Sequence, residues 1–137
     1  MSQENLEIVR RVYEAVGRDD SEAVLALYDP GVETDWSRLP ESGLSGQAVT
    51  FRGHDGLRSL HRVWNEAWSS AEDHCDELID AGEQVVSVVT RRGRGRTSGV
   101  EVQTRRAGVW TVREGRVVRT VWFASVSEAL KAVGLEE

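Results

Sequence analysis

His61 is the residue of this sequence whose type and position best suit acid–base chemistry. It lies next to Trp64 on the apolar side of a helix that we expect to begin at Gly53. An imidazole near its unperturbed pKa of about 6.5 can donate or accept a proton close to neutral pH. A histidine on an apolar helix face is more commonly a hydrogen-bonded core residue, so His61 has two possible roles, one chemical and one structural.

Tryptophan is the second residue type that could form a site, because the chain has 5 of them. Trp64 and Trp68 follow helical spacing, and Trp110 and Trp122 lie on two expected strands. If these indoles converge, they form the mainly apolar wall of a small-molecule pocket; otherwise they form a core. A buried indole or phenol also needs a hydrogen-bond partner, which a ligand oxygen could supply. The residues that we expect to bind a ligand are Tyr13, Tyr28, Trp36, Leu60, His61, Trp64, Trp68, Arg106, Trp110 and Trp122.

Arginine could add an anion-binding group to such a pocket. Arg106 can hold an anionic ligand through two parallel hydrogen bonds, or it can lie exposed at a rim. The arginines at 91, 92, 94, 96, 105 and 106 are interrupted by glycines, which fits a solvent-exposed hairpin tip or a patch for an anionic partner. Because the net charge is −6 and no aromatic residue is interleaved with the arginines at 91–96, we expect no nucleic-acid partner.

Other kinds of site lack their characteristic residues. His74, Cys75 and Asp76 do not have the spacing of a metal-ligand set, and the sequence shows no phosphate-binding glycine loop or nucleophile elbow. We therefore predict neither a metal nor a cofactor. No apolar run approaches the roughly 18 residues of a membrane span, so we expect no membrane partner. The polar N-terminus shows no signal peptide, and the single cysteine fits a cytoplasmic protein.

The elements that must position these residues follow from hydrophobic periodicity. A length of 137 residues with 39% hydrophobic residues suits one domain, residues 1–137. Helices precede an antiparallel meander, which predicts an α+β fold rather than alternating βαβ units. The expected elements are helices at 3–17 and from 21 to about 28, a short strand at 32–36, a loop at 37–52, a helix from 53 that includes Trp68, strands at 71–80 and 83–92, a hairpin at 99–125 that turns at Arg113-Glu114-Gly115, and a helix at 127–133.

The same stretches carry a family resemblance that covers nearly the whole chain. The matching segments are Glu7–Ala15, Leu25–Glu33, Phe51–Gly56, Gly99–Val102, Val109–Val118 and Glu128–Leu130. They resemble the nuclear transport factor 2-like superfamily, specifically its small bacterial SnoaL-like (polyketide-cyclase-type) and ketosteroid-isomerase-like members. The resemblance implies a strongly curved antiparallel sheet wrapped around the N-terminal helices, a cone-shaped, cystatin-like α+β barrel. It also implies an apolar pocket on the concave side and a homodimer through the outer sheet face.

Strand alternation then predicts which side chains face the concave side. Counting from the Gly115 turn selects Gly108, Trp110 and Val112, joined by Thr104 and Arg106 if no bulge intervenes; the other arm contributes Val118, Thr120 and Trp122, and the neighbouring strand Val86, Val88 and Thr90. The outer face would then carry Val109, Thr111, Val121 and Phe123, whose apolar character needs cover.

The resemblance also suggests catalytic positions, and this chain fills them incompletely. Asp35 lies on the strand that carries the general base of isomerase-like members, but its register places Thr34 inward. Tyr13 lies near the oxyanion-hole tyrosine, although the register places Val12 there. Gly108 stands where isomerase-like members have a second acid. Epoxide-hydrolase-like members have an arginine paired with an acid; Arg106 matches the arginine, but Gly108 again stands in place of the acid.

Three functions therefore stay open. The first is a small-molecule-binding SnoaL-like domain of unassigned activity with an aromatic-lined hydrophobic pocket for a hydrophobic or aromatic ligand. The second is a cofactor-free isomerase, cyclase, dehydratase or epoxide-hydrolase-type enzyme with Asp35 and His61 as candidate catalytic residues. The third is a dimeric interaction module. If Asp35 and His61 both face solvent, the acid–base hypothesis in this form is wrong.

Overall fold

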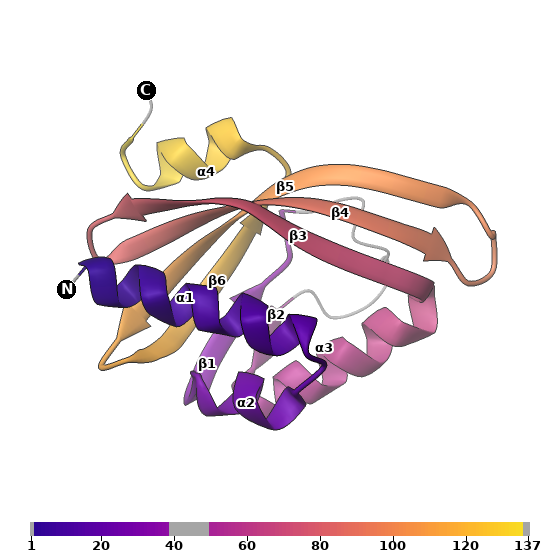
Figure 1. Cartoon of the computed structure of the whole chain (residues 1–137), viewed down its shortest axis with the longest axis horizontal. Coiled ribbons are helices and arrows are strands. Elements are labelled where there is room, and N and C mark those ends of the chain that lie inside the picture. Colours follow the sequence, from indigo (N-terminus) through magenta and orange to yellow (C-terminus); the bar gives the residue numbers. More distant parts are fainter. Residues whose placement is uncertain (1, 39–49, 136–137) are drawn as a thin grey trace.

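The computed structural model describes residues 2–38 and 50–135 and has four helices and six strands within them. The expected loop at 37–52 lies mostly outside the described residues. In chain order the elements are α1 (Ser2–Gly17), α2 (Ser21–Ala26), β1 (Tyr28–Asp35), β2 (Thr50–Arg52), α3 (Gly53–Ala67), β3 (Trp68–Ala81), β4 (Gln84–Gly95), β5 (Glu101–Arg113), β6 (Arg116–Phe123) and α4 (Val126–Ala132), drawn in Figure 1.

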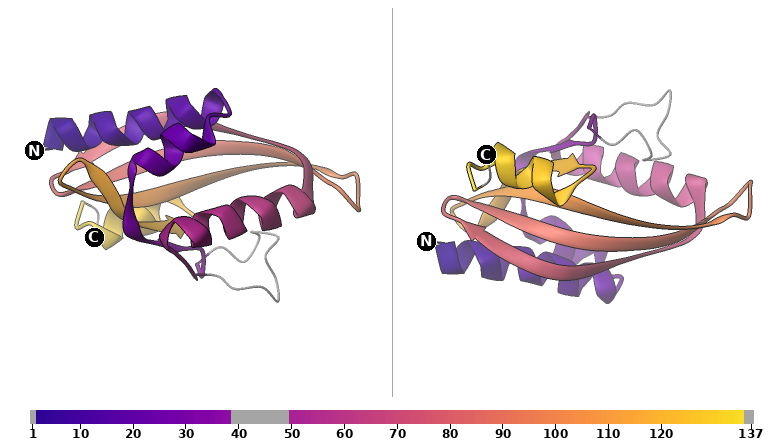
Figure 2. Two further views of the ribbon diagram at one scale, coloured as in Figure 1. Left: turned by 90° about the horizontal axis from the view of Figure 1, so that it is seen from below. Right: turned by 90° about the horizontal axis from the view of Figure 1, so that it is seen from above.

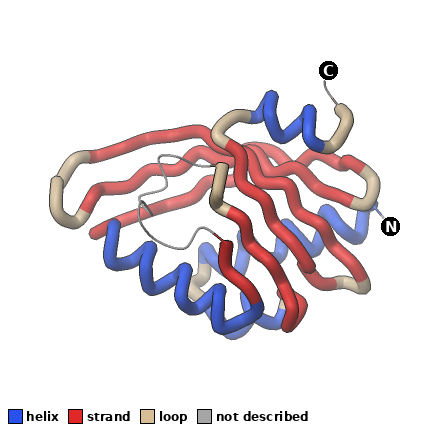
Figure 3. The backbone as a smooth tube through the Cα atoms, turned by 180° about the vertical axis from the view of Figure 1, so that it is seen from behind, coloured by secondary structure: helices blue, strands red, loops and turns tan. Residues whose placement is uncertain are grey.

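The strands form one curved sheet in the order β2-β1-β6-β5-β4-β3. Every neighbouring pair is antiparallel except β1 and β6, which run parallel. Helices α1, α2 and α3 lie against one face and α4 against the other (Figures 1 and 2). The tube drawing shows the same curvature from behind (Figure 3). The predicted α+β fold, with a curved sheet around the N-terminal helices, is confirmed.

Two element boundaries differ from the prediction because strand pairing overrides the local helical pattern. Tyr28 belongs to β1, since it pairs with Val117 of β6 and the Val117 amide donates to the Leu27 carbonyl at 2.8 Å. Pro30, which lacks an N–H group, falls in an irregular part of the β1–β6 ladder. Trp68 has an extended backbone and pairs with Gly95, so it begins β3 instead of ending α3.

The β5–β6 hairpin forms as predicted. Glu114 and Gly115 both have positive φ, 52° and 75°, which is the backbone of a two-residue type I′ turn. The concave positions of β5 are confirmed by their neighbours on β4: Ser87 pairs with Gly108, Val85 with Trp110, Val89 with Arg106 and Arg91 with Thr104.

The predicted concave positions of β4 and one position of β6 are wrong. Val85, Ser87, Val89 and Arg91 face inward, so Val86, Val88 and Thr90 face outward. A shift of one residue reverses every side chain of a strand, and no tight turn fixes the β4–β5 register. On β6, Val118 is the extra residue of a bulge, since Thr111 pairs with Arg119 and Val112 with Val117, and Val117 therefore faces inward in place of Val118.

The outer face of the sheet has a cover within the same chain. Helix α4 packs its buried Ala129 against Val86, Ala107, Val109 and Phe123, with Leu130 at the margin of this second core. The N-cap of this helix is Ser125, whose hydroxyl accepts from the Glu128 amide at 3.2 Å. Two of the outer residues from which a dimer was inferred, Val109 and Phe123, are thus already buried by α4.

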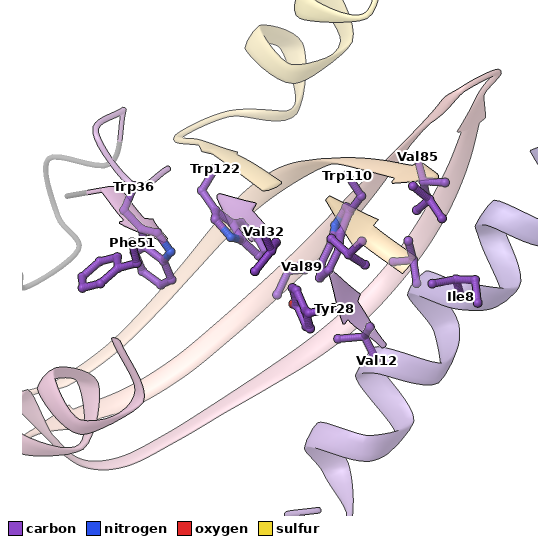
Figure 4. Close-up of a cluster of buried hydrophobic side chains, with 13 residues drawn as sticks. Ile8, Val12, Tyr28, Val32, Trp36, Phe51, Val85, Val89, Trp110 and Trp122 are labelled. Carbon is purple, nitrogen blue, oxygen red and sulfur yellow. The ribbon is translucent and has the colours of Figure 1, made fainter. Parts of the chain in front are cut away.

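The main core lies on the concave side. It extends from Ile8 and Val85 at one end, past Tyr28 and Trp110, to Trp36 and Phe51 at the other end (Figure 4). The ring of Trp122 lies between Trp36 and Trp110, so aromatic residues follow one another along this face. The two ends of this core differ in chemistry, and the candidate site lies at only one of them.

Candidate functional site

One end of the concave side is a closed hydrogen-bonded cluster around Ser87. The Ser87 hydroxyl, which is 0% exposed, accepts from the Tyr13 hydroxyl at 3.0 Å and from Trp110 Nε1 at 2.8 Å. The Tyr13 and Trp110 rings meet edge to face, with centroids 5.7 Å apart. Burial, only partly offset by the hydrogen bond with Ser87, raises the pKa of Tyr13 well above its usual value. The Tyr13 hydroxyl therefore donates its hydrogen bond to Ser87 in the core and not to a substrate oxyanion.

Gly108 shows why an acid is missing beside this cluster. A Cβ atom at Gly108 would lie 3.1 Å from Ser87 Oγ, 3.1 Å from Trp110 Nε1 and 3.2 Å from the Trp122 ring. The Ser87 hydroxyl and the two indoles thus occupy the space that a larger side chain would need. No carboxylate of the isomerase or epoxide-hydrolase type can project from this position.

Gly108→Ala is expected to destabilise the fold by about 1–3 kcal/mol, because overpacking a filled core forces side chains out of their rotamers. Urea unfolding followed by tryptophan fluorescence measures this change. Gly17→Ala is the matched control, since a Cβ there meets nothing within 4 Å and alanine favours helix. Equal stability of the two variants would contradict the close packing around Gly108.

The other end of the concave side gathers most of the tryptophans. Ring centroids lie 5.4 Å apart for Trp36 and Trp64, 5.4 Å for Trp64 and Trp68, and 6.0 Å for Trp36 and Trp122. The expected convergence of indoles is thus found, with Trp36 directly after β1, Trp64 from α3, Trp68 from β3 and Trp122 from β6. We call Trp36, Trp64, Trp68, Arg91 and Arg106 the aromatic end of the concave side.

Arg91 is the central cation of the aromatic end, and it was not among the predicted ligand-binding residues. Its side chain is buried, and its Nε and Nη2 donate to the two carboxylate oxygens of Asp73 at 2.5 and 2.6 Å. Its guanidinium lies 4.4 Å from the Trp64 ring centroid and 5.3 Å from that of Trp36. A two-pronged ion pair and two cation–π contacts hold this cation in place.

Arg106 lines the same end. It is 4% exposed, and its Nε donates to the Thr104 hydroxyl at 3.2 Å. A cavity of about 10 Å³ is lined by Trp64, Trp68, Arg91, Gly93, Val102, Thr104 and Arg106. A water molecule needs at least that space. The described side chains thus leave only a narrow crevice here.

Several buried polar atoms at this end have no hydrogen-bond partner among the described residues. At this end they are Trp36 Nε1, Trp68 Nε1 and Arg91 Nη1, while Thr34 Oγ1 and Thr120 Oγ1 lie nearer the middle of the concave side, where Thr120 pairs with Trp110. Thr34 and Thr120 pair across β1 and β6, so these atoms belong to neighbouring positions of one wall. Buried polar groups are nearly always satisfied in folded proteins, by protein, water or ligand. Their concentration here marks the aromatic end as the candidate site.

Neither Asp35 nor His61 is among the residues that line the crevice at the aromatic end. His61 is exposed on α3, where its Nε2 lies 3.1 Å from Asn65 Nδ2. The apolar stripe of α3 runs through Leu57, Leu60 and Trp64, and His61 lies one step of about 100° beyond Leu60. Leu60 packs against the core but does not line the crevice.

Asp35 lies on the other side of β1 from the buried Thr34, as the strand count indicated. Its Oδ1 accepts from the Ser37 amide at 2.8 Å. Partial burial opposes ionisation, but the hydrogen bonds from Ser37 and the charges of Arg119 and Arg38 outweigh it and lower the pKa of Asp35. A carboxylate stabilised in this way is a weak base.

The arginine cluster divides among separate roles. Arg96 donates to the backbone carbonyls of Asn65 at 2.8 Å and Trp68 at 3.1 Å, which satisfies acceptors at the C-terminal end of α3. Arg94 donates to the Gly99 carbonyl at 2.9 Å within the hairpin end. The cluster is therefore not one patch: Arg96 fixes the position of Trp68, and Arg91 and Arg106 turn inward.

A larger hollow at the opposite end of the molecule is open and charged. It measures about 1020 Å³ and lies between α1 and the β5–β6 turn, lined by residues that include Glu4, Glu7, Arg11, Glu83 and Glu114. Small-molecule sites are mostly enclosed and apolar, so this hollow is a weaker candidate than the aromatic end. Among residues 2–38 and 50–135, no group of His, Cys, Asp and Glu is arranged to hold a metal ion. None of the described helices is long and apolar enough to cross a membrane.

A curved α+β sheet closed over helices, with an aromatic interior, is the architecture of nuclear transport factor 2-like proteins. The SnoaL-like domain family model matches residues 9–120, and the chain belongs to this family. No match to a curated protein is found.

Solved structures agree with this assignment. An NTF2-like protein from Burkholderia thailandensis is 30% identical with a TM-score of 0.77, over 92% of this chain and 96% of that one. TerC, co-crystallised with polyporic acid, is 21% identical with a TM-score of 0.76, over 95% and 98%. A Mycobacterium tuberculosis protein in complex with estradiol-17beta-hemisuccinate is 13% identical with a TM-score of 0.72, over 90% and 95%.

Proposed function

We propose that this protein binds a hydrophobic or aromatic small molecule at the aromatic end. The observation that carries the proposal is the set of buried, unpartnered polar atoms on a wall of indole rings. An unsatisfied buried donor or acceptor costs about 1–3 kcal/mol, which a ligand that supplies partners recovers. Two proteins of the same fold, TerC and the Mycobacterium tuberculosis protein, are described with cyclic organic molecules, which supports a binding role for the fold.

Binding requires the crevice to widen, because about 10 Å³ accommodates no organic ligand. Trp64 and Trp68 are only half-buried and stand at its edge, so their rings are the ones that would swing aside. Trp68 also contacts Gly93, where a Cβ atom would lie 2.9 Å from the indole ring. The absence of a side chain at Gly93 leaves the indole room to lie flat on β4.

Indole N–H resonances test this proposal with the neutral probe N-phenyl-1-naphthylamine. We expect the Nε1–H resonances of Trp36 and Trp68 to shift on titration, because these donors have no partner among the described residues. The Trp110 resonance should move least, since Trp110 donates to Ser87. Heteronuclear NMR with single Trp→Phe variants for assignment gives the measurement.

Trp68→Ala should weaken binding of the probe about tenfold or more, since stacking on an aromatic ring and its buried area are both lost. Leu135→Ala is the matched control, because it removes an exposed apolar side chain that does not line the crevice. If no indole resonance shifts, or if both variants bind the probe like the native chain, the aromatic end is not a binding site.

A homodimer and a cytoplasmic location stay predictions from the sequence. Helix α4 supplies cover for much of the outer sheet face, so a dimer there would use the half-buried Thr111 and Val121 beside α4. Light scattering at micromolar concentration decides between monomer and dimer. Catalysis of the isomerase type is not part of the proposal, because Gly108, Tyr13 and His61 each lack the placement that it requires.

A further inference from the structure

The aromatic end contains a buried cation with bonding capacity left over, and this bears on the charge of the ligand. A guanidinium has five N–H donors. Nε and Nη2 of Arg91 donate to Asp73, while Nη1 is buried without an acceptor among the described residues. Arg91 is 6% exposed, so water does not freely solvate the remaining donors. An oxygen acceptor can therefore add at Nη1 without displacing Asp73.

The surroundings of Arg91 favour a negative acceptor over a neutral one. Asp73 is partly exposed, at 23% of its side chain, so it neutralises Arg91 from the solvent side. Arg106, also buried, lines the same crevice from the adjacent strand. A hydrogen bond from a guanidinium to a charged oxygen is about twice as strong as one between neutral groups. Two inward-facing guanidinium groups also make this space unfavourable for a cation.

The indole rings themselves exclude a cationic ligand. The rings of Trp36, Trp64 and Trp122 around one point would otherwise form a cage for a quaternary ammonium group. The guanidinium of Arg91 already stands over all three, at 5.3, 4.4 and 6.0 Å from their centroids. A ligand cation would have to displace Arg91 and leave Asp73 without its partner.

We infer that the ligand is an aromatic or polycyclic acid, with a flat apolar body against Trp64 and Trp68 and an anionic oxygen group on Arg91 Nη1. This inference rests on the proposed binding function of the aromatic end. It adds the charge class of the ligand and assigns Arg91 as the residue that determines specificity.

Two fluorescent probes of nearly the same shape test this inference. 8-Anilinonaphthalene-1-sulfonate differs from N-phenyl-1-naphthylamine only by its sulfonate, so the ratio of their affinities isolates the contribution of the anionic group. The variant Arg91→Met with Asp73→Leu removes cation and carboxylate together and keeps the net charge. We expect the ratio of sulfonate to neutral affinity to fall about tenfold or more in this variant, as the loss of a charge-assisted hydrogen bond implies.

Arg92→Met with Glu72→Leu is the matched control, because Glu72 and Arg92 pair in the same register on the outer face. This control should keep the native ratio. Arg91→Lys, which keeps the charge but loses the guanidinium fork, should also lower the ratio and serves if the double variant does not fold. Tetramethylammonium chloride should not displace the neutral probe from the native chain.

The outcomes separate the two proposals. If the neutral probe binds to the aromatic end but the affinity ratio is the same in every variant, the inference about charge is wrong and the binding function stands. Displacement of the neutral probe by tetramethylammonium also overturns the inference about charge. If neither probe binds the native chain, the proposed function and the inference fail together.

Discussion

Asp73→Ala is expected to lower the free energy of unfolding by about 2–4 kcal/mol, because it leaves Arg91 buried without its carboxylate. Arg91 is enclosed by Trp36, Trp64 and Trp122 and cannot reach water without opening the core. Breaking a fully buried ion pair costs about 3–5 kcal/mol, and the partial exposure of Asp73 reduces this cost. Urea unfolding monitored by circular dichroism and by tryptophan fluorescence measures the loss.

Two variants make this result specific. Glu72→Ala, next to Asp73 on β3 but on the outer face, removes an exposed carboxylate and should cost at most about 1 kcal/mol. Asp73→Leu with Arg91→Met should recover most of the native stability, because an apolar pair of similar volume needs no charge compensation. An Asp73→Ala variant as stable as Glu72→Ala would show that Arg91 is not held by this ion pair.

The Arg91–Asp73 ion pair also bears on how the proposed binding site is compatible with a nearly filled interior. Arg91 is fixed on one edge by Asp73 and on its faces by indoles, so its orientation does not depend on a ligand. The backbone of Trp68 is held by Arg96, which donates to its carbonyl, and its half-buried ring packs against Trp64. The proposed site would therefore combine a preorganised charged group with half-buried rings at its edge, so that only the rings need to move on binding.

Local patterns predicted the elements well where the chain itself carries the cause. The β5–β6 hairpin follows from β-branched residues and a turn at Glu114-Gly115, and counting from that turn gave the inward positions of β5 correctly. The helices predicted at 3–17 and 127–133 are found as α1 and α4, within one residue of the predicted bounds. Each of these features depends on a few neighbouring residues, so the sequence alone determines it.

The central residue of the candidate site was missed because its burial depends on distant residues. Arg91 looked like part of a charged hairpin tip, since arginines are mostly exposed. Its inward position depends on the β4–β5 register, and its neutralisation depends on Asp73 from the next strand. If the β4–β5 register had been known, alternation along β4 would have placed Arg91 on the concave face together with Val85, Ser87 and Val89. His61 was misplaced by a single helical step.

The other large effect concerns the opposite end of the core, where Ser87→Ala is expected to destabilise the fold by about 2–4 kcal/mol. This change removes the only described acceptor for two buried donors, the Tyr13 hydroxyl and Trp110 Nε1. Each buried donor left without an acceptor costs about 1–3 kcal/mol. Ser69→Ala, which removes an exposed hydroxyl that donates to the Arg94 carbonyl, is the control and should cost less than about 1 kcal/mol.

A double-mutant cycle with Tyr13→Phe separates the hydrogen bonds from the loss of a hydroxyl. Tyr13→Phe alone should cost only about 0.5–1.5 kcal/mol, since Ser87 keeps Trp110 as a donor. Adding Ser87→Ala then orphans Trp110 alone, so the double variant should be more stable than the sum of the single effects predicts. Strict additivity would show that Tyr13 and Ser87 do not interact. The coupling would identify this end of the cone as structural, in contrast to the unsatisfied donors around Arg91.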